Sequence, residues 1–306
     1  MIKFKFKSLV EFMDYFRTEE ICRREFAKIR FPSGEYCPYC EHNEIYKFSG
    51  GRRYRCAGCK QDFSIKTGTI FGDSKLPLRK WFIAIYLMRT SPKGISSLQL
   101  AKHVGVTQKT AWFMAHRIRK AHKQETRKLR GKVEADETYI GGKAKNMHAR
   151  RRRQIFNGRG TVAKIPIFGL KTRTGKVRAH VIESADMETL HTRLKENVVK
   201  GATLYTDEWR GYNRLGRRFK RGVVQHGAGE YVRGNAHING IESFWALFKR
   251  GYHGTYHSMS KKHLQRYVDE FVVRFNNRLN PPQRIFHGAI QSAADTTQLT
   301  YESLTA

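Results

Sequence analysis

The chain has 306 residues, with 59 lysines and arginines against 26 aspartates and glutamates, which gives a formal net charge of +33 at pH 7. Because self-repulsion of this size disfavours folding, we expect a polyanionic partner, and nucleic acid explains the charge better than an anionic membrane surface. A hydrophobic fraction of 40% with 12% aromatic residues excludes a disordered basic tail. The longest apolar run, 81–88, is far too short for a membrane span, and the N-terminal residues lack the apolar core of a signal peptide. A folded protein of the cytoplasm, associated with the nucleoid, is therefore expected.

The first 35 residues, 1–35, are predicted to be a helical segment. An amphipathic pattern covers 9–29 and ends at the Phe-Pro-Ser-Gly sequence 31–34. Cys22 lies within this pattern and is interpreted as a small, buried hydrophobic residue.

The other four cysteines form two C-x2-C pairs with fifteen residues between the pairs. This spacing predicts a zinc ribbon over 36–66, in which two tight turns present four thiolates to one Zn²⁺. Gly50 and Gly51 stand where the intervening hairpin must turn. Two disulfides are the alternative, but thiols inside the cell stay reduced. Four thiolates leave no open position on the metal, so a structural Zn²⁺ is expected. The ligands are Cys37, Cys40, Cys56 and Cys59.

Residues 77–126 are expected to form a helical region that contains a DNA-binding helix-turn-helix. The first helix is predicted at 97–103, the turn at Gly105, and Thr107 is a suitable N-cap for the second helix. Apolar side chains at i, i+3, i+4 and i+7 predict a buried stripe, formed by Ala111, Met114, Ala115 and Ile118. The opposite side suits the major groove of DNA, although such helix pairs also occur in ordinary cores. Its outward-facing side chains are predicted to be Gln108, Lys109, Trp112, His116 and Arg119.

Beyond Gly131 the pattern changes to one of strands and helices. Strand-like runs and helical runs in this order predict an α/β domain with a mixed sheet over 131–280. Residues 281–306 have the composition of a polar C-terminal tail. The predicted strands are 133–140, 164–170, 176–182 and 203–206, and the predicted helices are 187–199, 241–249 and 261–276.

A basic loop, 143–159, contains no acidic residue and is expected to contact DNA phosphates. A solvated loop or a localisation signal is the alternative. Its central residues are Arg150, Arg151, Arg152 and Arg153.

Two aspartates are candidates for a magnesium site in this basic protein. Asp136 lies in the first strand of the α/β domain and Asp207 ends a later one, so neighbouring strands would bring both carboxylates to one edge of the sheet. Mg²⁺ prefers a few carboxylate ligands together with substrate phosphate. Since successive side chains on a strand point to opposite faces, Glu137 and Glu208 should point away. Glu134 shares a face with Asp136 and is a possible extra ligand.

Glu242 is the third candidate. The alternative to a catalytic role is a structural one, in a capping box with Asn239 as N-cap and Glu242 three residues later. Lys249, seven residues after Glu242, lies about two helical turns further along the same face, where a cation could hold a flanking phosphate. Spacing alone leaves both interpretations open.

The chain from residue 9 to residue 279 resembles bacterial insertion-sequence transposases that carry an ISXO-like DDE domain and an N-terminal zinc ribbon. Asp207 and Glu242 have 34 residues between them, an interval on which such enzymes resemble one another, and Lys249 occupies the place of their basic residue. Phe31 departs from the tryptophan expected in the family, which affects packing and not chemistry. The matching stretches are 30–34, 37–40, 66–71, 77–81, 136–142, 206–209, 237–242 and 275–278.

This resemblance implies an α+β multidomain protein with an RNase H-like catalytic domain. It implies that Asp136, Asp207 and Glu242 hold two Mg²⁺ (or Mn²⁺) ions across a scissile phosphate of double-stranded DNA, first for cleavage and then for strand transfer. Lys249 and Arg250 would contact DNA, and pairing of two element ends implies a homodimer or a higher oligomer. No ATP is expected, because the glycine-containing sequence 169–177 has the wrong spacing for a phosphate loop. The alternatives are a catalytically silent DNA-binding regulator, or domesticated relative, and a nuclease that hydrolyses without joining.

Overall fold

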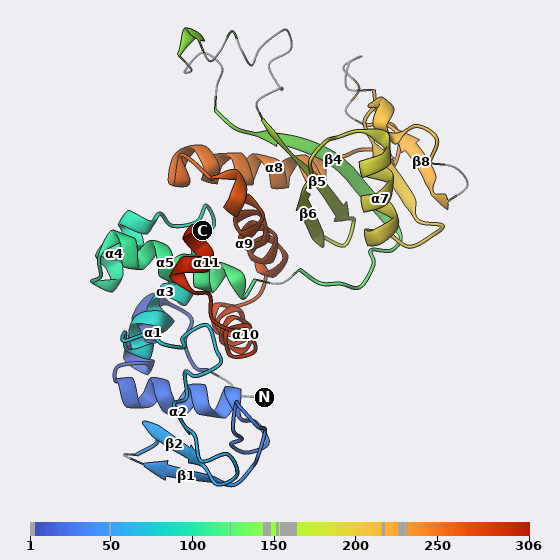
Figure 1. Cartoon of the computed structure of the whole chain (residues 1–306). Helices are drawn as coiled ribbons and strands as arrows, with labels where there is room; N and C mark the ends of the chain where they lie inside the picture. The colour runs from blue at the N-terminus through green and yellow to red at the C-terminus, as the bar shows by residue number, and fades with distance from the viewer. Residues whose placement is uncertain are drawn as a thin grey trace. The chain divides into compact units, whose positions relative to one another are not determined.

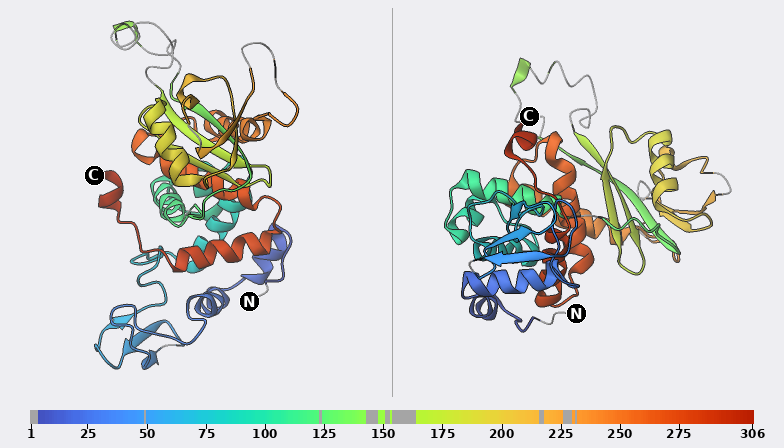
Figure 2. Two further views of the ribbon diagram at one scale, coloured as in Figure 1. Left: turned by 90° about the vertical axis from the view of Figure 1, so that its right-hand side faces the viewer. Right: turned by 60° about the horizontal axis from the view of Figure 1, so that its bottom comes forward.

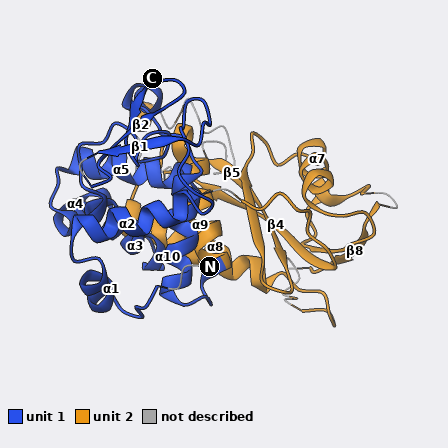
Figure 3. Ribbon diagram, turned by 90° about the horizontal axis from the view of Figure 1, so that it is seen from below, with its two compact units in different colours: residues 1–123, 277–306 blue, residues 124–276 orange. Residues whose placement is uncertain are grey.

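The computed structural model of the chain describes residues 4–48, 50–122, 124–142, 148–150, 153, 164–215, 218–225, 230 and 232–306. The chain divides into two compact units, residues 1–123 with 277–306, and residues 124–276 (Figure 3). The first unit has one continuous hydrophobic core, and the second has one core on each side of a sheet. No helix within the described ranges is long and apolar enough to cross a lipid bilayer.

The N-terminal segment forms two helices, α1 (Leu9–Tyr15) and α2 (Glu19–Arg30), where the sequence pattern predicted one. The break occurs because the hydroxyl of Thr18 accepts a hydrogen bond from the N–H of Ile21 and starts a new helix. Cys22 on α2 is completely buried, which confirms its interpretation as a core residue.

The cysteine-containing segment forms a three-stranded antiparallel sheet of β1 (Ile45–Phe48), β2 (Arg53–Cys56) and β3 (Asp62–Phe63), seen at the bottom of Figure 1. The predicted hairpin turn is confirmed, because Gly50 and Gly51 both have positive φ angles, 63° and 78°. Glycine adopts this conformation without the steric cost that a Cβ imposes.

Three helices follow, α3 (Leu78–Thr90), α4 (Ser97–Val104) and α5 (Gln108–Lys120). The turn between α4 and α5 has Gly105 at φ 67°, and the side chain of Thr107 caps α5 by accepting from the N–H of Thr110. The predicted turn and cap are therefore confirmed. So is the buried stripe of α5, because all four of its apolar residues are at most 3% exposed.

The C-terminal residues are not a tail, and the prediction of one over 281–306 is wrong. They form α10 (Pro282–Ala294) and α11 (Tyr301–Thr305), and α10 packs against α2 and α3 (Figure 2). The reason is a set of apolar side chains on one face of α10, led by Phe286, which joins the core of the first unit. The aromatic rings with centroids 5.0–5.8 Å from that of Phe286 belong to Phe4, Phe6, Phe12, Phe16 and Phe82.

The second unit is built on a five-stranded mixed sheet in the order β6-β5-β4-β7-β8. β4 pairs antiparallel with β5 and parallel with β7, β5 pairs antiparallel with β6, and β7 pairs parallel with β8. This is the mixed sheet expected of an RNase H-like domain, with β8 as the strand that the sequence pattern missed. The strands are β4 (Lys132–Ile140), β5 (Ile165–Thr172), β6 (Val177–Val181), β7 (Thr203–Thr206) and β8 (Lys220–Val223).

Helices cover both faces of this sheet. Leu190 and Leu194 of α7 (Met187–Asn197) share a core with Val133 and Ala135 of β4. On the other face, α8 (Asn239–Gly251) and α9 (Leu264–Asn277) share a core with Ile140 of β4. Successive side chains of β4 therefore point to opposite faces of the sheet, as the alternation of a strand requires. Shorter helical turns are η2 (Arg210–Tyr212), η5 (Tyr252–Tyr256) and η6 (Lys261–His263).

Candidate functional sites

The four paired cysteines come together in the zinc-ribbon segment. Their Sγ atoms all lie within 4.8 Å of one another, with 3.6 Å between Cys37 and Cys59 and 3.5 Å between Cys40 and Cys56. A disulfide would require about 2 Å, and all five thiols of the chain are free. Two thiolates at about 2.3 Å from a tetrahedral Zn²⁺ lie about 3.8 Å apart. The four thiols therefore fit one closed zinc site.

Three acidic residues of the second unit are placed by three different elements. Asp136 is on β4, Asp207 directly follows β7, and Glu242 is in the first turn of α8. Glu134 of β4 pairs with Tyr205 of β7 in parallel, so Asp136 and Asp207 lie at the same level of neighbouring strands. The neighbouring position of the two strands, on which the predicted site depends, is thus observed.

Asp136 and Glu137 point to opposite faces of the sheet. Asp136 pairs with Gly169 of β5, where an added Cβ would lie 2.3 Å from Trp245 of α8, so Asp136 is on the α8 face. Glu137 pairs with Phe168, which belongs to the core shared with α7. Only the aspartate of this pair lies on the same face as α8 and Glu242.

The carboxylates influence one another electrostatically. Burial raises the pKa of Asp136 to about 7, with further upward contributions from the charges of Asp207 and Glu242 and a downward one from Lys249. The three acids and Lys249 therefore share one region of the second unit. They do not form as tight a set as the cysteines, which are the one such group of metal-ligating atoms in the described part of the chain. A buried carboxylate beside two others is an environment that a divalent cation stabilises.

Glu137, on the opposite face of the sheet, also interacts electrostatically with Asp136 and Asp207. Burial raises the pKa of Glu137 to about 8, and the negative charges of Asp136 and Asp207 also act to raise this pKa. The hydroxyl of Tyr212 donates a hydrogen bond to the Glu137 carboxylate, which acts to lower it. Tyr212 is itself completely buried. The sequence pattern did not reveal this partner, because Tyr212 follows Asp207 in a short turn of no regular period.

The position of Asp207 depends on two further contacts. Its Oδ1 accepts a hydrogen bond from the N–H of Trp209 at 3.0 Å, an Asx turn that fixes the side chain. Arg221 of β8 donates to the carbonyl of Asp207 at 3.0 Å and to the hydroxyl of Thr206 at 3.0 Å. Arg221 was missed because β8, a Lys-Arg-Gly-Val sequence, lacks the alternation of a half-buried strand.

Glu134 is not aimed at the aspartates, although the alternation placed it on their face. Its carboxylate is fully buried and accepts hydrogen bonds from the N–H of Ile241 at 2.7 Å and from Arg173 at 2.6 Å. The alternative of a capping box formed by Asn239 and Glu242 is not observed, because the N-cap position of α8 is Ile238 and no local side chain caps the helix. The cap comes from a strand more than a hundred residues earlier, which short-range sequence patterns do not reveal.

Comparison with known proteins identifies both units. Residues 128–276 match the model of the ISXO2-like transposase domain, and residues 17–62 match that of the transposase zinc-ribbon domain. An uncharacterized protein in transposable element ISH50 of Halobacterium salinarum is 34% identical over 272 residues, which cover 85% of this chain and 91% of the relative. The chain belongs to the ISXO2-like transposase family.

A second relative of this transposase family is shorter. An uncharacterized transposase-like protein of Haemophilus influenzae is 30% identical over 103 residues, which cover 33% of this chain and 82% of the relative. No solved structure matches the chain.

The residues of α5 that were predicted to contact DNA differ in their exposure to solvent. Gln108 and Lys109 are exposed in the first turn of α5. Gln108 donates to the hydroxyl of Ser97 at 2.8 Å, and the Lys109 ammonium lies 4.9 Å from the ring centre of Tyr301. Arg119 is only 3% exposed, so its predicted role as an outward DNA contact is wrong.

The cause of the Arg119 error is the surroundings of α5. His116, Arg117, Ile118 and Arg119 are all buried, so this part of the helix is covered on every side and has no outward face. Sequence periodicity identifies the most apolar stripe of a helix but not a second buried side lined by long polar side chains.

The remaining predicted DNA contacts lie in the second unit. Lys249 and Arg250 are exposed in the last turn of α8. Arg150 and Arg153 are exposed, whereas Arg151 and Arg152 lie outside the described residues.

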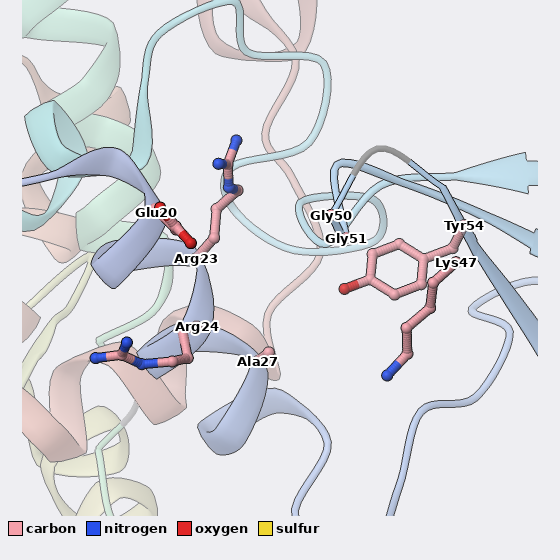
Figure 4. A pocket seen from close by; sticks show the side chains of 8 residues that line it. All are labelled: Glu20, Arg23, Arg24, Ala27, Lys47, Gly50, Gly51 and Tyr54. Carbon is pink, nitrogen blue, oxygen red and sulfur yellow. The ribbon is translucent and has the colours of Figure 1, made fainter.

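The first unit also has a basic pocket that the sequence pattern did not suggest. It has a volume of about 280 Å³ and lies between α2 and the β1–β2 hairpin (Figure 4). Arg23 and Arg24 of α2 and Lys47 of β1 contribute cations, and Glu20 contributes one acid. Tyr54 is only 3% exposed, and its hydroxyl points from β2 toward the helix. Tertiary pairing of the helix with the hairpin creates this pocket, so no local motif signals it.

Proposed function

We propose that this chain is the active transposase of an insertion sequence, which cleaves element-end DNA and transfers the strand to a target. Asp136, Asp207 and Glu242 are the proposed ligands of two Mg²⁺ or Mn²⁺ ions. The observation that carries the proposal is the placement of Asp136 on β4, level with Asp207 after the parallel strand β7 and on the sheet face that packs against α8. The raised pKa of Asp136, which results from burial and from the charges of Asp207 and Glu242, agrees with this placement. Folding that places acids together at a cost in free energy is typical of a cation site.

The residues around the acids have distinct roles in this proposal. When bound, the cations would supply Lewis-acid activation of the attacking hydroxyl and neutralise charge at the scissile phosphate. Arg221 holds the backbone of Asp207. Lys249, whose charge acts on Asp136, is the proposed contact of a phosphate next to the one that reacts. Phosphodiester exchange conserves the bond type, so the chain requires no ATP. The four cysteines of the first unit would hold a structural Zn²⁺.

Recognition of double-stranded DNA is proposed for the exposed cations of both units. In the first unit these are Lys109, together with Gln108, and the basic pocket that contains Arg23. In the second unit they are Arg150, Arg153, Lys249 and Arg250. A net charge of +33 supports phosphate contacts over a wide area. Two element ends must be paired, so we infer a homodimer or a higher oligomer on DNA.

The first test separates cutting from binding. Asp136→Asn and Asp207→Asn should abolish Mg²⁺- or Mn²⁺-dependent cleavage of element-end DNA, because each removes a carboxylate ligand, while DNA affinity stays within about twofold. Glu208→Gln is the matched control, since it removes the neighbouring exposed acid and should leave cleavage intact. Cleavage and strand transfer are read on denaturing gels, and affinity by fluorescence anisotropy.

Each outcome of this test discriminates between functions. A wild-type protein that binds but never cuts with either metal would support the catalytically silent regulator. Cut products without joined strands would support a hydrolytic nuclease. Full cleavage by Asp136→Asn would overturn the assignment of the acids.

A further inference from the structure

Glu134 is a buried carboxylate with no role in the chemistry proposed above. It is on β4, two residues before Asp136 and on the same face, and its side chain is fully buried. An ionised carboxylate in such a position is unfavourable unless it is paired and hydrogen-bonded. Its two oxygens are used by different partners, Oε1 by Arg173 at 2.6 Å and Oε2 by the N–H of Ile241 at 2.7 Å.

The bond to Ile241 supplies the cap that α8 lacks locally. The helix starts at Asn239, and the carbonyl of Ile238 accepts from the N–H groups of Ile241 and Glu242 at 3.1 Å each. The N-cap residue Ile238 has no side chain that can cap the helix. A carboxylate at a helix N-terminus satisfies an unpaired donor and interacts favourably with the helix dipole. Glu134 therefore ties β4 to the residue directly before Glu242.

Arg173 extends this connection to two other segments. From the turn after β5 it donates to the carbonyl of Asn235 at 2.9 Å and to that of His237 at 3.1 Å, in the segment that leads into α8. One of its nitrogens also lies 2.7 Å from Nδ1 of His237. Its guanidinium lies 4.9 Å from the ring centre of Tyr205 on β7. The arginine thus holds the start of α8 against two strands of the sheet.

Two glycines allow α8 to lie this close to the sheet. A Cβ on Gly240 of α8 would lie 2.7 Å and 2.9 Å from the two carboxylate oxygens of Glu134. A Cβ on Gly169 of β5 would lie 2.3 Å from the ring of Trp245 and 3.0 Å from Ile241. The distances to Glu134 and to Trp245 are shorter than real contacts of a Cβ, so a side chain at either glycine would displace α8 or the side chain that it meets.

We propose that Glu134 and Arg173 form a positioning pair that fixes the start of α8 on β4 and thereby sets Glu242 relative to Asp136. This inference rests on the proposed function, because it concerns the geometry of the same metal site. Glu134 acts through Ile241 and is not itself a metal ligand. Rigid placement matters here, since residues that orient metal ligands typically change metal affinity by about 10- to 100-fold when they are altered.

The test compares three variants of the full-length protein. Glu134→Gln keeps an oxygen for the Ile241 N–H but loses the charge that pairs with Arg173, and Glu134→Ala loses both. Gly240→Ala removes neither charge, but its Cβ would lie 2.7 Å from Oε2 of Glu134, so it forces apart the Glu134 carboxylate and the start of α8. The Mg²⁺ concentration for half-maximal cleavage should rise by about tenfold in Glu134→Ala and Gly240→Ala and by less in Glu134→Gln, with DNA affinity unchanged. Glu196→Gln is the matched control, because it breaks the exposed ion pair with Arg193 on α7.

A second readout is independent of cleavage. Hydrogen exchange of the segment 238–243 should become faster in Glu134→Ala and stay unchanged in Glu196→Gln. If the wild type fails to cut DNA, the proposed function fails, yet exchange still decides whether Glu134 anchors α8. Folded Glu134→Ala and Gly240→Ala variants with wild-type metal dependence and wild-type exchange would overturn the positioning pair. Loss of one bound Mn²⁺ per chain in Glu134→Ala would overturn it in favour of a ligand role.

Discussion

Asp136 has a raised pKa because it is buried and because Asp207 and Glu242 add negative charge near it. Its folded-state pKa is about 7, against an ordinary value of 3.8. In the metal-free protein the folded state therefore binds a proton that the unfolded state has released. The contribution of this group to the free energy of unfolding is largest at low pH and is lost as pH rises toward and through 7.

This sign leads to a prediction for the metal-free protein. Between pH 5 and pH 8 the wild type should lose more stability than Asp136→Asn, because asparagine cannot ionise. Mg²⁺ added at pH 8 should restore stability to the wild type and not to the variant. Thermal unfolding at the two pH values, with and without the metal, measures both effects.

The comparison between the two proteins is essential, since the 13 histidines titrate in the same range. Their contribution is common to both proteins and cancels in the difference. Equal pH dependence of the wild type and Asp136→Asn would contradict the electrostatic description of the site.

β6 is an edge strand whose outer backbone groups are covered by side-chain amides. Gln124 donates to the carbonyl of Ala179 at 2.7 Å and accepts from its N–H at 3.2 Å. Asn276 bonds in the same two-sided way to Val177, at 2.8 Å and 2.9 Å, and Gln265 accepts from the N–H of Val181 at 2.7 Å. These three side chains occupy the place of a missing strand, and an edge covered in this way cannot pair with another chain.

The side-chain amides that bond to the edge of β6 lead to a prediction about stability and self-association. Gln265→Leu and Asn276→Ala should each lower the free energy of unfolding by about 1–3 kcal/mol, because buried backbone groups lose their partners. Both variants should also associate more readily through the uncovered edge. Urea unfolding and sedimentation velocity measure the two effects.

Gln291→Leu serves as the control, since Gln291 is exposed on α10. Its stability should change by no more than about 0.5 kcal/mol. If Gln265→Leu and Asn276→Ala behave like this control, the amide cover has no role at the edge.

Single elements also show how far local patterns reach. The alternation of β4 and the cap of α5 could be predicted from neighbouring residues, because those features arise within a few positions of the chain. β8 and the start of α8 could not, since Arg221 and Glu134 act across the sheet on residues that are distant in sequence. Arg119 was misassigned for the same reason, because its burial depends on what surrounds α5.

The first unit is discontinuous in sequence, and its C-terminal helix completes its core. Phe286 is 1% exposed and lies among phenylalanine rings from the first 82 residues. The segments 1–35, 36–66 and 77–126, which the sequence suggested as separate domains, share this core. Because this core contains residues from both ends of the chain, the stability of the first unit depends on the C-terminal segment 277–306.

Phe286→Ala should therefore destabilise the first unit by about 3–5 kcal/mol, as is typical for removal of a buried phenylalanine. The second unit, 124–276, should keep its stability, because its cores contain no residue of α10. Hydrogen exchange resolved by segment, with increasing urea, measures the two units in one protein.

Leu279→Ala is a matched control within the same C-terminal segment, because Leu279 is 88% exposed. It should change stability by no more than about 0.5 kcal/mol. Equal destabilisation of both units by Phe286→Ala would mean that they unfold as one.

Residue types and spacings alone determined the features with local causes. These are the four thiols of the ribbon, the turn of its hairpin and the capped second helix of the helix-turn-helix. They also include the three candidate acids, Asp136, Asp207 and Glu242. Tertiary structure alone decided which helix end Glu134 caps, which side of α5 is covered, and where the C-terminal helices pack. The physical reason is that a cap, a turn or a strand alternation depends on residues a few positions apart. Burial and long-range hydrogen bonds depend on which surfaces meet after the chain has folded.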